Sequence, residues 1–267
     1  MKIGPESAAA SAISASNSRT ILVRGFDLVE DLIGQTSFTD YVWLLITGAL
    51  PSRAQSAIFD AALVAIAEHG LVPSVQASRM TLAAAPEAFQ GAVAAGLLGC
   101  GSVILGATEA AGRFSTEVLS LTSMSLTDAV AKVLARYRAE KLPVPGFGHP
   151  LHKAGDPRAK KLLETAKRLG VAGAHVEAMR ETERQLPGVI GKALPMNVSA
   201  AIPAVLLDAG YPLPALKGAP LLARAAGLVG HLLEEIKRPI GFHMSHAASA
   251  SIRYDGPAPA GFVADEN

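Results

Sequence analysis

The chain has 267 residues, half of them apolar, and its 24 basic and 23 acidic residues leave a formal net charge of +1. This length suits one large domain or two unequal lobes, and the scattered, balanced charges exclude the basic stripe typical of nucleic-acid or anionic-lipid binding. A single cysteine, Cys100, excludes an internal disulfide and suits a reducing compartment. We therefore predict a cytoplasmic protein with neither a nucleic-acid nor a membrane partner.

The first residues, 1–18, are rich in alanine and serine and lack the continuous apolar core of a secretory signal. They predict a flexible N-terminal arm. The most membrane-like segment, residues 91–107, is short for a span and contains several glycines, which favours a close-packed buried helix pair.

Helical spacing of apolar residues recurs along the rest of the chain. Phe38, Val42 and Leu45 follow the capping residue Ser37, and the run stops at Gly48, so we expect a short helix with Phe38 and Trp43 in the core. Further helices are predicted over residues 54–68, 158–169 and 174–186, and from Pro220 toward Lys237. Because alternating strand patterns are scarce, the predicted fold class is all-α.

The segment over residues 144–159 is the longest irregular stretch with chemistry-bearing side chains. It places His149 in a turn of prolines and glycines, and Arg158 nine residues later at a helix start. An imidazole exchanges a proton near neutral pH, and a guanidinium binds a carboxylate in bidentate fashion. This pairing suits a carboxylate-bearing ligand.

Other histidines invite a metal interpretation that the sequence does not support. His149 with His152, and His243 with His246, have a spacing that chelates a metal on a helix, but the first pair lies in a loop and no carboxylate set completes either pair convincingly. We expect no metal. His231 shares a helical face with Arg224 and is interpreted as a partly buried structural histidine.

An ordered series of motifs covers most of the chain. It comprises residues 23–28, 38–51 (ending Gly-Ala-Leu-Pro), Glu68-His69-Gly70, Gly106-Ala107-Thr108-Glu109-Ala110, the loop from Gly146-Phe147-Gly148-His149 to Asp156-Pro157-Arg158-Ala159, Arg224-Ala225-Ala226-Gly227 and Arg238-Pro239. This series resembles citrate synthase, and more closely its shorter relative citryl-CoA lyase, also found as the C-terminal part of ATP-citrate lyase.

The resemblance implies a large helical domain over residues 19–112 and 211–267, with a smaller helical domain over 113–210 that carries the active-site loop. It also implies a homodimer, or a dimer of dimers, with composite sites. The ligands that it implies are a coenzyme A thioester and a polycarboxylate or 2-oxo acid.

Residue roles follow from the same resemblance. It implies that His69 contacts the hydroxy-polycarboxylate and that His149 exchanges the proton of the substrate's hydroxyl or carbonyl oxygen. It assigns carboxylate binding to Arg158, Arg224 and Arg238, and coenzyme A binding to Gly146, Phe147, Gly148 and Lys153. By local sequence alone, His69 would serve equally well as a C-terminal helix cap before Gly70.

Two positions depart from the citrate synthase pattern. Ser199, in Asn197-Val198-Ser199, stands where the family has an aspartate that moves the proton at the acetyl carbon, and a serine hydroxyl is no base unaided. Ile104 stands at the place of the enolate-binding histidine, where citryl-CoA lyases also resemble this chain in having an apolar residue.

The sequence therefore predicts a carbon–carbon lyase that releases acetyl-CoA and a 2-oxo acid with altered proton transfer, in which Ser199 orients a water. Two alternatives stay open. The site could catalyse another acyl-CoA reaction such as hydrolysis or decarboxylation, or the chain could be a non-catalytic acyl-CoA-binding regulatory subunit.

Overall fold

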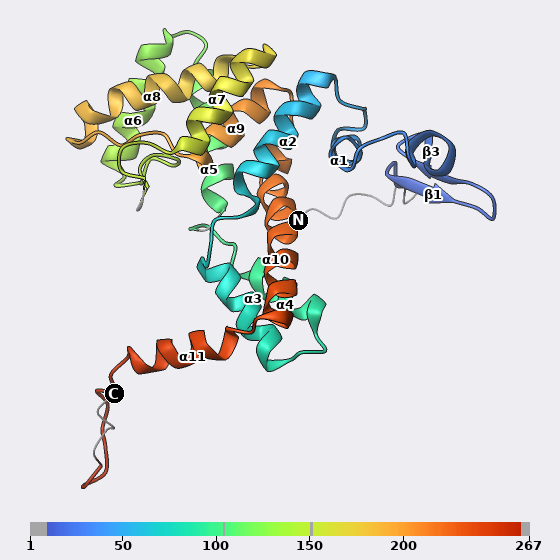
Figure 1. Cartoon of the computed structure of the whole chain (residues 1–267). Coiled ribbons are helices and arrows are strands. Elements are labelled where there is room, and N and C mark those ends of the chain that lie inside the picture. Colours follow the sequence, from blue (N-terminus) through green and yellow to red (C-terminus); the bar gives the residue numbers. More distant parts are fainter. Residues whose placement is uncertain (1–9, 104, 150–151, 263–267) are drawn as a thin grey trace. The chain divides into compact units, whose positions relative to one another are not determined.

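The computed structural model describes residues 10–103, 105–149 and 152–262. Helices dominate these residues, and three short strands form one small antiparallel sheet (Figure 1). The predicted all-α fold class is confirmed. The chain divides into two compact units, Met1–Ala65 with Ala107–Lys217, and Ile66–Gly106 with Gly218–Asn267. The division into large and small domains stays a prediction.

The first unit holds the sheet and most of the helices. Its elements are β1 (Ser14–Ser16), β2 (Ile21–Val23), β3 (Phe26–Asp27), the π-helix η1 (Leu28–Leu32), α1 (Phe38–Thr47), α2 (Arg53–Ala67), α5 (Gly106–Ser120), α6 (Leu126–Ala139), α7 (Pro157–Leu169), α8 (Ala174–Ile190), α9 (Val198–Asp208) and the 3-10 helix η2 (Leu213–Ala215). Helices α2 and α5 extend across the boundary into the second unit.

Strand β1 lies within the predicted N-terminal arm and pairs antiparallel with β2, which pairs in turn with β3. Sequence patterns did not indicate these strands, because two or three residues are too few to show an alternation of polar and apolar side chains. A cluster of Val23, Leu32 and Leu44 joins the sheet, η1 and α1.

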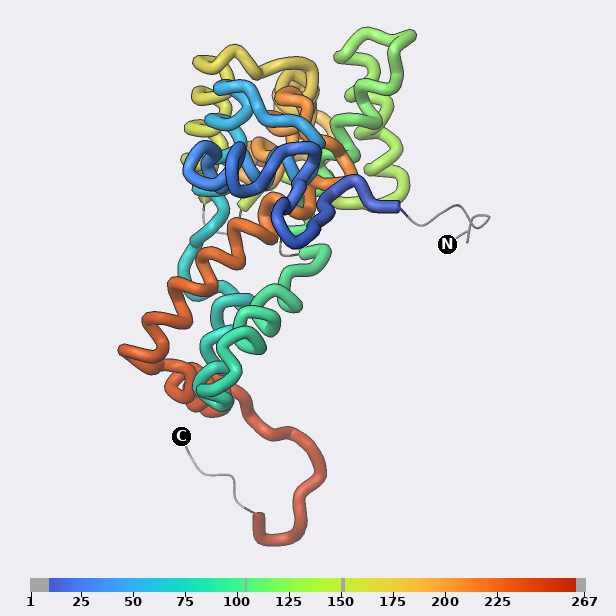
Figure 2. Tube along the Cα trace, turned by 90° about the vertical axis from the view of Figure 1, so that its right-hand side faces the viewer, coloured from blue at the N-terminus to red at the C-terminus, as the bar shows by residue number. Residues whose placement is uncertain are grey.

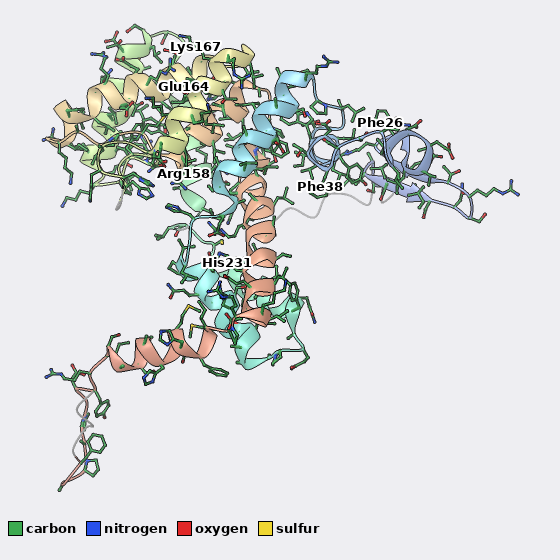
Figure 3. The ribbon with its side chains drawn as sticks, in the orientation of Figure 1. Phe26, Phe38, Arg158, Glu164, Lys167 and His231 are labelled. Atoms are coloured by element: carbon green, nitrogen blue, oxygen red, sulfur yellow. The ribbon has the colours of Figure 1, made fainter. Side chains whose placement is uncertain are left out.

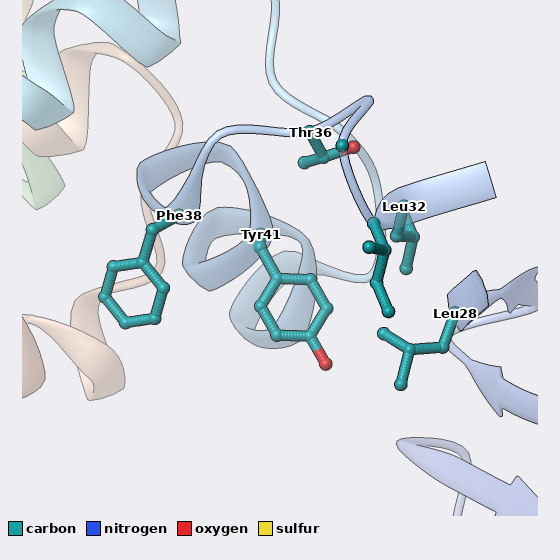
Figure 4. Close-up of a pocket in the computed structure, with 7 residues that line it drawn as sticks. Leu28, Leu32, Thr36, Phe38 and Tyr41 are labelled. Carbon is teal, nitrogen blue, oxygen red and sulfur yellow. The ribbon is translucent and has the colours of Figure 1, made fainter. Parts of the chain in front are cut away.

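Helix α1 begins and ends where the sequence predicted. Ser37 accepts a hydrogen bond from the backbone N–H of Asp40 at 3.1 Å, and Gly48 takes the left-handed conformation with φ 84°. Trp43 is buried against Phe59, but the core prediction for Phe38 was wrong, since 74% of it is exposed. Phe38 instead lines a cavity of about 270 Å³ near Leu28, Leu32 and Tyr41, whose lining carries no charged side chain (Figure 4).

Helix α9 forms the centre of the helical part of the first unit. It packs against α7 and α8, and nearly all of its side chains from Val198 to Leu206 are buried. Asn197 caps its N-terminus by accepting the backbone N–H of Ser199 at 2.9 Å. A helix buried on every side is fixed by its neighbours, so its first turn offers a rigid place for a functional side chain.

The second unit is built from α3 (Pro73–Ala84), α4 (Phe89–Leu98), α10 (Gly218–Lys237) and α11 (Gly241–Ala250). Helices α3, α4 and α10 lie side by side in both views (Figures 1 and 2). Gly96 permits the close approach of α4 to α10, because a Cβ there would lie 2.6 Å from a methyl carbon of Leu228. Within the described residues, no helix is both long and apolar enough to cross a bilayer.

Candidate functional site

The loop before α7 is joined to the residues that open α9, about fifty positions later in the chain. Phe147 and Met196 form an isolated antiparallel bridge, the N–H of Gly148 donates to the carbonyl of Pro195 at 2.8 Å, and the N–H of Asn197 donates to the carbonyl of Gly146 at 2.9 Å. The side-chain amide of Asn197 donates to the carbonyl of Gly148 at 2.6 Å. The predicted site residues Gly146, Phe147 and Gly148 thus lie beside the turn that carries Ser199.

Two features of the contact between this loop and the first turn of α9 require a glycine at position 146. Its φ of +86° is left-handed, and a Cβ there would lie 2.4 Å from the Cβ of Ala200. Any side chain would push the loop off the first turn of α9. The glycine at this position therefore serves the close approach of two backbone segments.

His149 lies in this loop, half-buried, with its ring stacked on that of His152. The ring centroids are 4.5 Å apart, and the backbone N–H of His152 donates to His149 Nδ1 at 3.1 Å. A nitrogen that accepts a hydrogen bond carries no hydrogen, so the neutral ring of His149 carries its hydrogen on Nε2 in this arrangement. Nε2 is then a donor suited to a carbonyl or carboxylate oxygen.

Arg158 lies at the start of α7, where Figure 3 labels it. Asp156 caps this helix, and its carboxylate accepts hydrogen bonds from Arg158 Nε at 3.0 Å and Nη2 at 2.9 Å. It also accepts the N–H of Val198 at 2.9 Å, so one buried carboxylate joins the loop, α7 and α9. Burial by itself would raise the pKa of Asp156, but the bonds from Arg158 and Val198 outweigh it and lower that pKa to about 2.

Sequence reasoning missed Asp156 as an organising residue of the site. The signal was present, because an aspartate directly before a proline at a helix start is a strong N-cap pattern. A residue that caps a helix and also faces an arginine two positions later is positioned to form the bidentate pair that the structure contains.

A groove of about 430 Å³ lies along α2 and α7 in the first unit. Its lining is mostly apolar, with Arg158 and Lys161 as its cationic members, and consists of Ala61, Val64, Ala65, Pro157, Arg158, Lys161, Leu162 and Thr165. Lys153, predicted to contact coenzyme A, is exposed in the loop. This surface combines apolar area with positive charge, which suits an amphipathic anion.

Arg224 is buried in the second unit, on the face of α10 that packs inward. It is 3% exposed, and within the described part of the chain its Nε and Nη1 atoms have no hydrogen-bond partner. A buried guanidinium with two unpaired donor atoms is costly, since each buried donor loses its hydration. An anion at this position would satisfy it.

Three further residues of the second unit were singled out by sequence. His69 lies between the end of α2 and the left-handed Gly70, and the side chain of Arg238, at the end of α10, is 81% exposed with Nη1 3.7 Å from Glu234 Oε1. His231, labelled in Figure 3, is partly buried with Nε2 2.9 Å from Glu68 Oε2, as its structural interpretation expected. The predicted site residues therefore come from both units of the chain. Ile104 lies outside the described residues.

A buried Ser–His–Asp arrangement in the first unit has a structural explanation. Ser115 Oγ lies 2.9 Å from His175 Nδ1, but Ser115 is fully buried, and Asp208 accepts backbone N–H groups of Gly173, His175 and Val176 rather than the ring. Burial lowers the pKa of His175 more than Asp208 raises it. The carboxylate caps α8, and the serine is inaccessible to a substrate.

Comparison with known proteins agrees with the motif series. The family model for the citrate synthase C-terminal domain matches residues 53–240. Citrate synthase of Haloferax volcanii is 28% identical over 214 residues, which cover 79% of this chain and 55% of that protein. The chain spans about half the length of the curated relatives it matches.

Solved structures extend the likeness over nearly the whole chain. Citryl-CoA lyase from Hydrogenobacter thermophilus is 31% identical, with 96% of this chain and 98% of that chain covered and a TM-score of 0.85. ATP citrate lyase from Methanothrix soehngenii, in complex with citrate and coenzyme A, shares the fold at 19% identity and a TM-score of 0.77, covering 98% of this chain and 44% of that one. With a family match over more than half of its residues, the chain belongs to the citrate synthase family.

Proposed function

We propose that this chain is a carbon–carbon lyase of the citryl-CoA lyase type, which cleaves a 3-hydroxy polycarboxylyl-CoA thioester into acetyl-CoA and a 2-oxo acid. The observation that carries the proposal is the buried guanidinium of Arg224, whose Nε and Nη1 have no partner among the described residues. The likeness to citryl-CoA lyase over 96% of the chain supports the choice of substrate class.

Carboxylate recognition would use Arg158, Arg224 and Arg238, the three arginines that the resemblance implies. Arg224 offers two unsatisfied donor atoms. Arg158 uses Nε and Nη2 on Asp156, which leaves Nη1 for a ligand oxygen. Arg238 is exposed at the end of α10 and would bind a third carboxylate, and His69 would add a hydrogen bond. A polycarboxylate needs several such cations, because each buried negative charge must be paired.

His149 would act on the oxygen of the carbon that becomes the 2-oxo carbonyl. With its hydrogen on Nε2, the ring donates a hydrogen bond to that carbonyl. Cleavage requires the hydroxyl proton to move to Nε2, so the neutral ring must adopt the other tautomer when the substrate binds. The electrons of the broken carbon–carbon bond pass to the thioester as an enolate, which then takes up a proton to give acetyl-CoA.

Ser199 would orient the water that protonates this enolate. It occupies the first turn of the buried helix α9, beside the docked loop, and its backbone N–H is held by the side chain of Asn197. A hydroxyl can position a water but cannot supply the proton transfer of a carboxylate, so we expect slower turnover than with an aspartate at this position.

Coenzyme A would bind as part of the substrate, against the loop at Gly146, Phe147 and Gly148, with Lys153 near a phosphate. The apolar groove along α7, with Arg158 and Lys161 in its lining, is a second surface suited to this ligand. The proposed chemistry requires no metal ion. We further propose a homodimer or a dimer of dimers, which light scattering on a sizing column would test.

Mass-spectrometric product analysis tests the proposal. The purified chain is incubated with citryl-CoA, with other 3-hydroxy and β-keto acyl-CoA thioesters, and with acetyl-CoA plus 2-oxo acids, beside His149→Ala. We expect carbon–carbon cleavage or condensation that is lost in the variant. Hydrolysis alone would contradict the lyase.

The alternative of a non-catalytic acyl-CoA-binding subunit is favoured by one observation, the serine at position 199 in place of a carboxylate. It predicts coenzyme A binding without turnover, and binding that is unchanged in His149→Ala. Isothermal titration with coenzyme A, run beside the citryl-CoA product assay on both proteins, separates the two functions, because only the lyase predicts turnover that His149→Ala abolishes.

A further inference from the structure

A connected network of charged side chains lies in the second unit, between the His69 turn and the Arg238 end of α10. Its members are Glu68, Arg79, His231, Glu234 and Glu235. The sequence assigned a function to none of these residues. Glu68 appeared only within the motif Glu68-His69-Gly70, and His231 was interpreted as structural.

Arg79, on α3, is the centre of this network and is 2% exposed. Its Nε lies 2.7 Å from Glu235 Oε2 and its Nη1 lies 2.8 Å from Glu234 Oε2. Its Nη2 donates to the carbonyl oxygen of Arg238 at 3.3 Å, and Nη1 is 3.4 Å from His231 Nδ1. One guanidinium therefore contacts three residues of α10 and the backbone carbonyl of a predicted carboxylate-binding residue.

Glu235 extends the network to the turn between α10 and α11. It is 2% exposed, and its Oε1 accepts the backbone N–H groups of Ile240 at 2.9 Å and Gly241 at 2.7 Å. A Cβ on Gly241 would lie 2.5 Å from the Cβ of Ala83, so α11 begins in direct contact with α3. The turn that follows Arg238 is thereby fixed at both of its ends.

The opposite end of the network holds the turn that carries His69. His231 Nε2 lies 2.9 Å from Glu68 Oε2, and Glu68 Oε1 accepts the backbone N–H of Gly70. The residues before and after His69 are thus joined through Glu68. Burial by itself would raise the pKa of Glu68, but the bonds from His231 and Gly70 lower it, which keeps the carboxylate charged.

Stability alone gives no reason for this arrangement. The pair of Arg79 and Glu235 is buried on both sides, and replacing such a pair by apolar residues of similar volume is often neutral or stabilising, so the geometry that the pair imposes is the better explanation of it. In this unit the charged network fixes the backbone at Arg238 and the turn that carries His69.

We propose that Arg79 is a positioning residue that holds Arg238, and through His231 and Glu68 also His69, in the geometry required to bind a polycarboxylate. The inference rests on the proposed function, because that function makes Arg238 and His69 ligand-binding residues.

Arg79→Lys is the first test. A lysine keeps the positive charge that Glu235 needs, but one ammonium cannot reach two glutamates and the Arg238 carbonyl in the same fixed fork. We expect the dissociation constant for citrate, measured by isothermal titration, to rise about tenfold, while that for coenzyme A changes less than twofold. Arg180→Lys, in the exposed pair with Glu177, is the matched control and should change neither constant.

A double-mutant cycle separates positioning from a general loss of structure. If Arg79 acts through Arg238, then Arg79→Lys should weaken citrate binding far less in an Arg238→Ala background than in the wild type. An equal effect in both backgrounds, or a parallel loss of citrate and coenzyme A binding, would overturn the inference.

Glu68→Gln provides the second variant should Arg79→Lys fail to fold. A glutamine keeps an acceptor for the Gly70 N–H and loses the charge that faces His231, so we expect citrate binding to weaken about threefold, and this effect to vanish in a His69→Ala background. Unchanged citrate binding in Glu68→Gln would overturn the inference.

Failure of the proposed function would give a different result. If the wild type fails to cleave citryl-CoA and yet binds citrate in an Arg79-dependent manner, the lyase proposal fails and the positioning role stands. If the wild type cleaves citryl-CoA and its citrate binding is unchanged by Arg79→Lys, the positioning role fails alone. A wild type that binds neither citrate nor coenzyme A would overturn both.

Discussion

Arg158 and Arg224 were predicted to do the same work, and they differ in what the chain provides for each. Arg158, in the first unit, is held by two hydrogen bonds to Asp156. Arg224, in the second unit, is buried with two donor atoms that have no partner among the residues described. One arginine is therefore paired within the chain, whereas the other keeps two buried donors that an anion would satisfy.

Among the variants that test this contrast, Arg224→Met should have the largest effect on citrate affinity. Methionine keeps the apolar length of the side chain and removes the charge, so citrate affinity should fall at least about 100-fold. The free energy of unfolding without ligand should rise by about 1 kcal/mol, because an uncompensated buried charge is gone. Titration calorimetry and urea unfolding measure the two effects.

Arg158→Met is the matched control, and here stability should change in the opposite direction. Removing Arg158 leaves the buried Asp156 carboxylate without its cation, so the free energy of unfolding should fall by about 2 kcal/mol. Equal stability changes in the two variants would show that the contrast between the two arginines is absent in solution.

Gly146→Ala tests the organisation of the first unit. An alanine there combines an unfavourable left-handed φ with a Cβ that overlaps Ala200, and should lower the free energy of unfolding by about 3 kcal/mol. Gly170→Ala isolates the backbone contribution, because Gly170 has φ 71° with nothing within 4 Å of a Cβ, and should cost only about 1 kcal/mol. Similar losses would mean that the loop is not docked on α9.

Asp156→Asn tests the pairing of Asp156 with Arg158 through the pH dependence of stability. The pKa of Asp156 is lowered from 3.8 to about 2 in the folded chain, so its ionised form contributes stability that is fully present above pH 4 and is lost as the pH falls toward 2. At pH 7 the variant should be less stable by about 2 kcal/mol. The difference between the two proteins in urea unfolding should shrink from pH 4 downward and vanish below pH 2, and a constant difference at every pH would refute this account of the pair.

Ser199→Asp has the smallest expected effect on binding and acts on turnover. If position 199 is the place of the proton-transferring carboxylate, the aspartate should raise kcat for citryl-CoA cleavage by about tenfold with little change in citrate affinity. Steady-state kinetics measures this, with Ser199→Asn as the control of equal size and no charge. No increase in a folded variant would argue against the assigned position.

Much of the fold followed from local patterns. Helix α1 begins after Ser37 and ends at Gly48, and α7 ends at Gly170, where capping chemistry predicted. The motif series identified the family, which the comparison with known proteins confirmed. Helix caps and sequence motifs are formed by residues close together in the chain, so they can be recognised in a single sequence.

Features made by distant residues were not predictable in the same way. Phe38 fits the helical spacing of a core residue, but its side chain is exposed, because spacing does not say which face finds a partner. The contacts of Arg79 with Glu234 and Glu235 join residues more than 150 positions apart, and no pattern of spacing reports such a pairing. The bond of Asp156 to Val198 is likewise visible only when the loop is docked.

The most direct test of the central claim is the product stoichiometry of citryl-CoA in a single turnover, followed by mass spectrometry for the wild type and His149→Ala. The account predicts acetyl-CoA and oxaloacetate in equal amounts from the wild type, and a rate at least about 100-fold lower in the variant. Free coenzyme A with citrate, or products formed equally fast by His149→Ala, would contradict it.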